Sequence, residues 1–433
     1  MSGRMNILFI TIYFPPMNNS ASIRSLYYAN YLRRLGHNVG VVTCSYNDDH
    51  VYYDAVLNKK IDDEVKIYRE SPGYVYSKTY SRKCENSSDS VGASNGRTRI
   101  KGVLKKYMAV PDSFVFWQKN AMKRAEKLIE DGEYDVIFSM HELPSSHMVA
   151  YRLKQRFPKI RWIAYWSDPW TVQSRERRDQ PLLRKLYERN VERNVVRDAD
   201  ACLFTSEQTR KVYVDAFGIE RVKTGIVYRG YDSAYYENVR RAGAPEWIVP
   251  DKLNIVHTGA IYTQLRDVDP FIDAIRRIKS ENEAVYEKLN IVLIGEIDNI
   301  DNIQRFEDLE AISVKKRVPF EEALRYMVFS NVNILWGNKG SSQIPGKVYE
   351  YMGADGCILT ILGDENDPLS DIMAEADRGP VVGNNSKDIS KAIIEIADLI
   401  DTDAMPRDWT SRNEKYEWEN VALDLADKIA GRA

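Results

Sequence analysis

The chain has 433 residues, of which 44% are hydrophobic and 29% charged, and this length favours two or three globular domains. Its formal charge of −2 argues against attraction of the whole chain to nucleic acid. The sequence contains no run of about 18 apolar residues, the length that a membrane-spanning helix would need.

Strands and helices alternate through the first half of the chain. The apolar run Asn6–Tyr13, ended by Pro15 and Pro16, predicts a buried strand, and Ser22–Leu35 repeats apolar residues at helical spacing. No GxGxxG follows the first strand, which counts against a standard dinucleotide-binding enzyme. Further strands are predicted at 39–44, 134–139, 160–166, 201–204 and 222–228, with helices at 115–131, 145–157, 181–197 and 207–217.

The alternation restarts after Tyr236–Pro250, which contains Gly243 and Pro245 and is interpreted as an interdomain linker. Strands are predicted at 253–257, 290–294, 314–318, 332–335, 357–361 and 380–382. Helices are predicted at 269–280, 303–312, 320–330, 345–352, 369–375, 387–400 and 412–429. The pattern predicts an α/β fold with two doubly wound Rossmann-like domains that face a central ligand cleft.

The segment Ser341–Met352 is a polar loop that runs into a helix. Pro345 suits the first helical turn, and Lys347 and Glu350 are three residues apart, so they share one helix face. Free N–H groups beside a lysine can bind an anion. A plain i,i+3 salt bridge is the alternative interpretation of the same residues.

A second candidate site is the loop after the first strand, where ligands bind in open α/β sheets. Asn19 and Ser20 are small enough for backbone N–H groups to approach a phosphate or a sugar, and Arg24 follows in the first turn of the helix. The alternative is a surface loop with a solvated arginine.

The opening ILFITIYFPPMNNSASIRSLYYANYLRRLGHNVGVVT resembles the start of bacterial glycosyltransferases of family four, which have the GT-B fold. The segments VPDSFVFWQ, WIAYWSDPWT, DADACLFTSE, RGYD and HTGAIYTQLRDVDPFIDAI resemble the same family in the same order. The resemblance implies an acceptor-binding domain at 1–245, a nucleotide-sugar-binding domain at 246–408, and a C-terminal helix at 409–433 that packs on the first domain.

The resemblance also implies roles for residues of the donor site. Arg266 and Lys347 correspond to the basic pair that holds the donor diphosphate, and Glu350 to the carboxylate that binds the ribose hydroxyls. Gly259 would let its loop approach the donor closely. Ser342 occupies the position of a second glutamate in many members, and Ile344 belongs to an Ile-Pro-x-Lys segment of relatives that also lack this glutamate. The identity of the donor sugar therefore stays open.

On the acceptor side, Asp168 follows a strand and is flanked by Trp166 and Trp170. These rings are expected to stack on a sugar, while Asp168 binds a hydroxyl or accepts its proton. The alternative is an aspartate that caps a turn. His141 follows another strand and is expected to contact the reacting groups.

The function expected from these observations is transfer of a sugar from a nucleotide-diphosphate sugar to an acceptor hydroxyl. The reaction is expected to retain anomeric configuration and to build a bacterial surface glycan or glycoconjugate. The expected acceptor is a glycan or a lipid-linked sugar. No cofactor and no metal are expected, because cationic side chains can carry the diphosphate charge. Alternatives are a GT-B subunit that binds a nucleotide or a partner without efficient catalysis, and a nucleotide-sugar epimerase.

A cytoplasmic location is expected, because the cysteines lack CxxC spacing and the first residues are too short and polar for a signal peptide. Residues 78–106 hold eight basic residues and two acidic ones. This basic loop predicts peripheral contact with the inner face of a membrane, with a solvated loop as the alternative.

Overall fold

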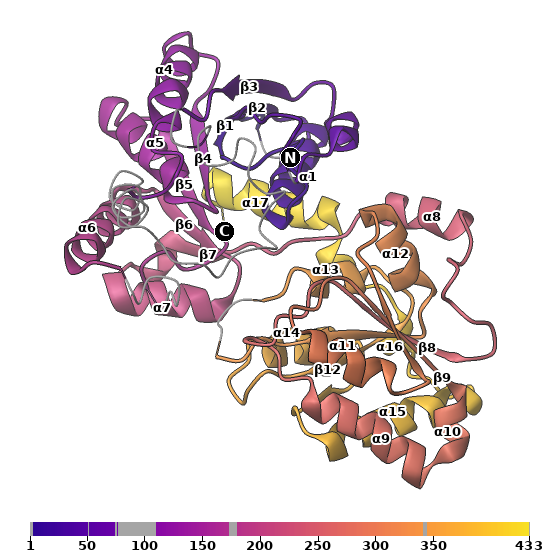
Figure 1. Cartoon of the computed structure of the whole chain (residues 1–433). Coiled ribbons are helices and arrows are strands. Elements are labelled where there is room, and N and C mark those ends of the chain that lie inside the picture. Colours follow the sequence, from indigo (N-terminus) through magenta and orange to yellow (C-terminus); the bar gives the residue numbers. More distant parts are fainter. Residues whose placement is uncertain are drawn as a thin grey trace. The chain divides into compact units, whose positions relative to one another are not determined.

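The computed structural model describes residues 3–50, 52–73, 76, 110–172, 180–340 and 344–432. Two compact units are present: unit 1 comprises Met1–Tyr228 and Val421–Ala433, and unit 2 comprises Arg229–Asn420 (Figure 1). The sequence suggested a boundary at residue 245, whereas the division falls before Arg229. Residues 409–420 lie in unit 2, so only the last part of the predicted C-terminal segment belongs to unit 1.

Unit 1 contains a seven-stranded sheet in which all strand pairs are parallel, in the order β3-β2-β1-β4-β5-β6-β7. The strands are β1 Asn6–Ile10, β2 Asn38–Cys44, β3 Lys66–Glu70, β4 Val136–His141, β5 Arg161–Trp166, β6 Ala201–Phe204 and β7 Thr224–Ile226. The order reverses between β1 and β4, so the loops that follow these two strands diverge at the site where α/β sheets bind ligands. The sequence interpretation missed β3, an edge strand with a largely polar sequence.

Helices cover both faces of this sheet. The core on one face is formed with α4 Trp117–Glu130, α5 Pro144–Arg156, α6 Leu182–Asp198 and α7 Glu207–Phe217. On the other face, Tyr28 of α1 Ser20–Arg34 packs against Phe138 and Tyr165. The C-terminal helix α17 Trp418–Ala430 also joins unit 1, where Arg161 Nε donates to the Ile429 carbonyl at 2.6 Å.

Unit 2 contains a six-stranded parallel sheet in the order β10-β9-β8-β11-β12-β13. The strands are β8 Leu253–Thr258, β9 Leu289–Ile294, β10 Ile312–Lys315, β11 Val332–Trp336, β12 Cys357–Ile361 and β13 Val381–Val382. Their near-continuous apolar sequences are typical of parallel strands buried on both faces.

The helices of unit 2 are α8 Ser233–Arg241, α9 Asp269–Glu281, α10 Glu283–Lys288, α11 Ile300–Glu307, α12 Phe320–Phe329, α13 Lys347–Met352, α14 Leu369–Ala376, α15 Ser386–Asp401 and α16 Arg407–Thr410. The linker interpretation was wrong for the start of Tyr236–Pro250, because α8 occupies it and packs on α12. Asp232 caps α8 by accepting from the Tyr235 N–H at 3.1 Å. The last helix begins at Trp418, later than the predicted 412, and Trp409 packs into the unit 2 core.

None of the helices in the described ranges is both long enough and apolar enough to traverse a bilayer. Within the described residues, Cys44, Cys202 and Cys357 are free and buried.

Candidate functional site

Two glycines bring the ends of β8 and β9 in unit 2 close together. Gly259 follows β8 with a φ of +129°, and a Cβ there would lie 2.3 Å from Cε of Lys347. Gly295 follows β9 with a φ of +148°, and its Cβ would lie 2.2 Å from the Gly259 carbonyl oxygen. L-residues with side chains rarely adopt such φ values. The Lys347 stem therefore passes over a surface that only glycine can provide.

Lys347 and Glu350 lie on one face of α13, as their spacing predicts. Lys347 Nζ is 3.8 Å from Glu350 Oε2, and both side chains are partly exposed. The helix begins at Lys347 and has six residues, so it is shorter than the predicted 345–352. A helix this short has a small macrodipole, and any anion affinity must come mainly from side chains. Ile344 is half-buried just before it, and Ser342 lies outside the described residues.

Arg266 is fixed by the backbone and by a neighbouring loop. Its Nη1 donates to the Ala260 carbonyl at 2.6 Å, and its Nε donates to Asn338 Oδ1 at 3.2 Å. The Lys339 N–H donates to the Leu265 carbonyl at 2.8 Å, which joins the same two loops a second time. The loop after β8 and the loop after β11 therefore hold this guanidinium in place.

Three arginines lie near enough to Lys347 for their charges to act on it, and Glu350 is its carboxylate neighbour. Burial lowers the pKa of Lys347, and the charges of Arg266, Arg229 and Arg317 lower it further, while Glu350 raises it. Burial also lowers the pKa of Arg266. A mutually repelling set of partly buried cations binds an anion favourably, because the anion relieves both the repulsion and the lost hydration.

Sequence reasoning missed Arg229 and Arg317. Arg229 is 8% exposed, and its Nη1 lies 2.1 Å from the position that a Cβ on Gly346 would take. Its guanidinium thus packs against the residue before Lys347. The RGYD segment contained the signal, but the chain separation between Arg229 and Lys347 concealed their proximity. Arg317 is exposed in the loop after β10.

His257 is near the end of β8, close enough to Arg266 and Lys347 for their charges to act on it. It is buried, its Nδ1 lies 3.0 Å from the Ile334 carbonyl oxygen, and its ring packs edge-on against Trp336. Burial lowers its pKa well below the ordinary value, and Arg266 and Lys347 add to the effect. His257 is therefore a neutral structural residue.

Arg378 holds the chain just beyond α13. Its guanidinium is 1% exposed and donates to four carbonyl oxygens. The acceptors are Met352 at 2.8 Å, Ala354 at 2.8 Å, Gly356 at 2.9 Å and Trp409 at 3.1 Å. Burial lowers its pKa to about 10. Carbonyl dipoles take the place of a carboxylate partner and fix the exit from the helix that bears Lys347.

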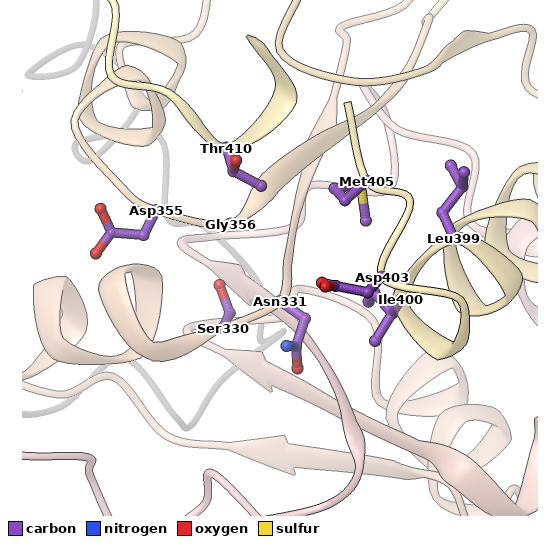
Figure 2. Close-up of a pocket in the computed structure, with 9 residues that line it drawn as sticks. All are labelled: Ser330, Asn331, Asp355, Gly356, Leu399, Ile400, Asp403, Met405 and Thr410. Carbon is purple, nitrogen blue, oxygen red and sulfur yellow. The ribbon is translucent and has the colours of Figure 1, made fainter. Parts of the chain in front are cut away.

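A separate pocket of about 290 Å³ lies in unit 2, next to Gly356 (Figure 2). It is lined by Ser330, Asn331, Asp355, Gly356, Leu399, Ile400, Asp403, Met405 and Thr410. None of the residues predicted for the donor site lines it. The cation cluster around Lys347 is thus distinct from this pocket.

In unit 1, the loop after β1 leads into α1 and supplies the residue that caps this helix. Asn19 caps the helix by accepting from the Ser22 N–H at 2.8 Å, and Ser20 is exposed as its first residue. Arg24 is 4% exposed, forms an ion pair with Glu142, and has its Cζ 5.2 Å from the centre of the Tyr165 ring. The alternative of a solvated arginine is therefore wrong. Burial alone would lower the pKa of Arg24, but Tyr165 and Glu142 raise it above its ordinary value.

Asp168 lies near this ion pair, since its charge acts on both Arg24 and Glu142. Segments that follow three strands thus contribute side chains to one polar cluster. These side chains are Arg24 in α1 after β1, Glu142 after β4 and Asp168 after β5. Burial raises the pKa of Glu142, with Arg24 opposing the shift. Sequence reasoning missed Glu142, which directly follows His141 in the chain.

His141 and Trp170 lie deeper than the sequence suggested. His141 is the last residue of β4 and is 4% exposed, and Trp170 is 1% exposed, with their ring centres 5.5 Å apart. Trp170 therefore packs in the interior, where it has no open face to stack on a sugar. The backbone N–H of Trp170 donates to the Tyr213 hydroxyl at 2.9 Å, which fixes the loop that bears Asp168.

Comparison with known proteins indicates a family. The model of Glycosyltransferase Family 4 matches residues 22–235. Residues 22–235, just under half of the chain, therefore carry the family 4 glycosyltransferase sequence pattern. The chain is accordingly an enzyme, a nucleotide-sugar-dependent glycosyltransferase. No curated protein sequence matches it significantly.

Solved glycosyltransferase structures share the GT-B fold of this chain. HepE of Anabaena, in complex with UDP, is 12% identical with a TM-score of 0.61, and the match covers 98% of this chain and 100% of that chain. WaaG, a glycosyltransferase involved in lipopolysaccharide biosynthesis, is 13% identical with a TM-score of 0.56, covering 98% and 100%. UDP-GlcNAc 2-epimerase from Neisseria meningitidis, bound to UDP-GlcNAc, is 11% identical with a TM-score of 0.58, also covering 98% and 100%.

Within the ranges that the structure describes, no group of three or more His, Cys, Asp or Glu side chains is placed to hold a metal ion.

Proposed function

We propose that unit 2 binds the diphosphate of a nucleotide sugar through Lys347, Arg266 and Arg229, and its ribose through Glu350. The observation that carries this proposal is the placement of Lys347, which lies over Gly259, is 3.8 Å from Glu350, and follows Gly346, against which the Arg229 guanidinium packs. A nucleoside diphosphate supplies both an anion for the cations and hydroxyls for Glu350. HepE, which shares the fold, is known in complex with UDP, which supports a uridine donor as the first to test.

In the proposed reaction, the bond from the anomeric carbon to the donor phosphate oxygen breaks, and a bond to the acceptor oxygen forms. The acceptor hydroxyl loses its proton, and the diphosphate leaves with added negative charge. Lys347 and Arg266 stabilise that charge, because their positions are already fixed before the reaction begins. This scheme needs no metal ion and no cofactor, and we propose that it proceeds with retention of configuration.

On the acceptor side, we assign Asp168 to the acceptor hydroxyl, with Arg24 and Glu142 as its charged neighbours. Because His141 and Trp170 are buried, their proposed role is to support the Asp168 loop. The acceptor is a glycan or a lipid-linked sugar of a bacterial surface polymer, a proposal supported by the fold shared with WaaG. The enzyme would then act in the cytoplasm, at the inner face of the membrane. The basic segment 78–106 lies outside the described residues, and its membrane contact stays a prediction.

Titration calorimetry with UDP and the other nucleoside diphosphates tests the donor site. Lys347→Ala is expected to weaken binding by roughly 10-fold or more, the loss of a charge-assisted contact worth about 1.5–3 kcal/mol. Lys391→Ala, at an exposed position of α15, is the matched control and is expected to bind like the wild type. Absence of binding by any nucleoside diphosphate would contradict the proposal. Formation of an epimer from a free nucleotide sugar, with no acceptor present, would favour the epimerase alternative.

A further inference from the structure

The loop after β12 carries a buried carboxylate. Asp367 is 2% exposed, and its Oδ2 accepts from the Gly363 N–H at 2.8 Å. Its Oδ1 accepts from the Leu369 N–H at 3.0 Å, at the start of α14. Burial raises the pKa of Asp367, and the two N–H groups oppose this shift. Capping of α14 is the plain interpretation of such a residue.

A second contact of Asp367 goes beyond helix capping, because the carboxylate fills the space where residue 337 would carry a side chain. A Cβ on Gly337, the residue after β11, would lie 1.7 Å from Asp367 Oδ2 and 2.6 Å from the Gly363 nitrogen. Gly363 makes the reverse contact, since its Cβ would lie 2.7 Å from the Lys339 nitrogen. The loops after β11 and β12 therefore pack backbone against backbone, and the Asp367 carboxylate lies at their contact.

Asp364 joins the same two loops at another point. Its Oδ2 accepts from the Gly340 N–H, and its Oδ1 accepts from the Asn366 N–H of its own loop at 3.0 Å. At the other end of the segment, the Gly337 N–H donates to the Ile361 carbonyl at 2.8 Å. The loop after β12 thus holds both ends of the segment that follows β11.

This segment, residues 337–340, is also the one that holds Arg266. Asn338 Oδ1 accepts from Arg266 Nε at 3.2 Å, and a backbone hydrogen bond joins the loops after β8 and β11 beside this contact. A path of direct contacts therefore runs from Asp367 through Gly337 and Asn338 to the guanidinium. Its links are backbone atoms and one short side chain, so a shift at Asp367 is passed on to Arg266.

We propose that Asp367 is a positioning residue for donor binding, which fixes Arg266 through the loop after β11. The carboxylate itself contacts backbone and no ligand. This inference rests on the proposed function of Arg266 as a cation for the diphosphate of a nucleotide sugar. A cation whose loop is already ordered binds an anion more tightly, because less conformational entropy is lost when the complex forms. A residue that only capped α14 would have no such effect on nucleotide affinity.

Titration calorimetry with UDP on Asp367→Asn tests this link. Asparagine keeps the shape of the side chain, but its NH₂ group meets an N–H donor where the aspartate has an acceptor. We expect UDP to bind about tenfold more weakly, whereas in an Arg266→Met background the same change should leave UDP affinity unchanged. Asp371→Asn, at an exposed position of α14, is the matched control and should bind like the wild type. Equal weakening with and without Arg266, or no weakening, overturns the proposal.

Hydrogen exchange of the chain without nucleotide gives a second measurement that does not depend on UDP. Asp367→Asn is expected to raise exchange several-fold in residues 337–340 and 260–266, and Asp364→Asn, which removes only the Gly340 contact, to raise it in 337–340. Faster exchange confined to α14 would show a helix cap alone and overturns the proposal. A wild type that binds no nucleoside diphosphate contradicts the donor site, and the exchange pattern then decides whether Asp367 holds the Arg266 loop.

Discussion

Substitution of Gly259 by alanine tests how closely the donor loop and Lys347 are fitted together. The added Cβ would lie 2.3 Å from Lys347 Cε, the flexible part of a side chain, so the lysine can move aside and the fold can survive. Forcing alanine to a φ of +129° costs about 1–3 kcal/mol of stability. The displaced ammonium loses a charge-assisted contact with the diphosphate worth about 1.5–3 kcal/mol. We therefore expect UDP to bind roughly 10- to 150-fold more weakly.

Gly243→Ala is the matched control for this prediction. Gly243 has a φ of +78°, lies in the same unit, and has nothing within 4 Å of the position of its Cβ. It is expected to lower thermal stability while leaving UDP affinity unchanged. Titration calorimetry on Gly259→Ala, Lys347→Ala and the double variant completes a thermodynamic cycle. The reasoning is refuted if Gly259→Ala weakens binding by the same factor with and without Lys347.

Three further predictions concern ionisation and buried polar groups. Because the pKa of Lys347 is lowered from 10.5, UDP affinity should begin to fall at a lower pH than it would with an ordinary lysine. Lys347→Arg should flatten this pH profile of UDP affinity, and an unchanged profile in the variant would refute the prediction. The pKa of His257 is far below 6.5, so the unfolded chain takes up a proton that the folded chain does not, and stability should fall as pH drops below that value. His257→Asn should reduce this slope in denaturation curves by up to about 1.4 kcal/mol per pH unit, and an equal slope would count against the assignment. Arg378→Met should lower the free energy of unfolding by about 3 kcal/mol or more, since it orphans buried carbonyls, whereas Arg276→Met, at an exposed ion pair, should cost under about 1 kcal/mol in the same urea titration.

Much of the fold could be predicted from apolar periodicity and breakers. The run Cys357–Ile361 is apolar apart from Thr360, and β12 has the predicted bounds. The helix α8 was missed because Gly243 and Pro245 drew the whole of Tyr236–Pro250 into a linker, although the helix ends before them. Edge strand β3 was missed because a half-exposed strand carries no apolar run. Local composition therefore fails where tertiary contacts decide the structure.

The candidate site was predictable only in part, for a related reason. The spacing of Lys347 and Glu350 is local, so the sequence indicates their shared face. The approach of Arg229 to Gly346 depends on how distant segments fold together, and no local pattern encodes it. Sequence position also places Trp170 at a strand end without telling whether its ring points outward, and here the ring points inward.

The order of synthesis constrains how unit 1 can fold. This unit takes its last helical segment from residues beyond 420, after the chain has passed through the whole of unit 2. Lys428 packs beside Gly225, and the Ile429 carbonyl accepts from Arg161, so these contacts are absent while the ribosome is still translating unit 2. A nascent chain can complete unit 2 first. Until residues beyond 420 are made, the surface of unit 1 at Gly225 and Arg161 stays uncovered. A fragment that stops at Tyr228 should therefore be a poor substitute for the unit, whereas a circular permutant that joins residues 421–432 to the N-terminus should fold unit 1 independently.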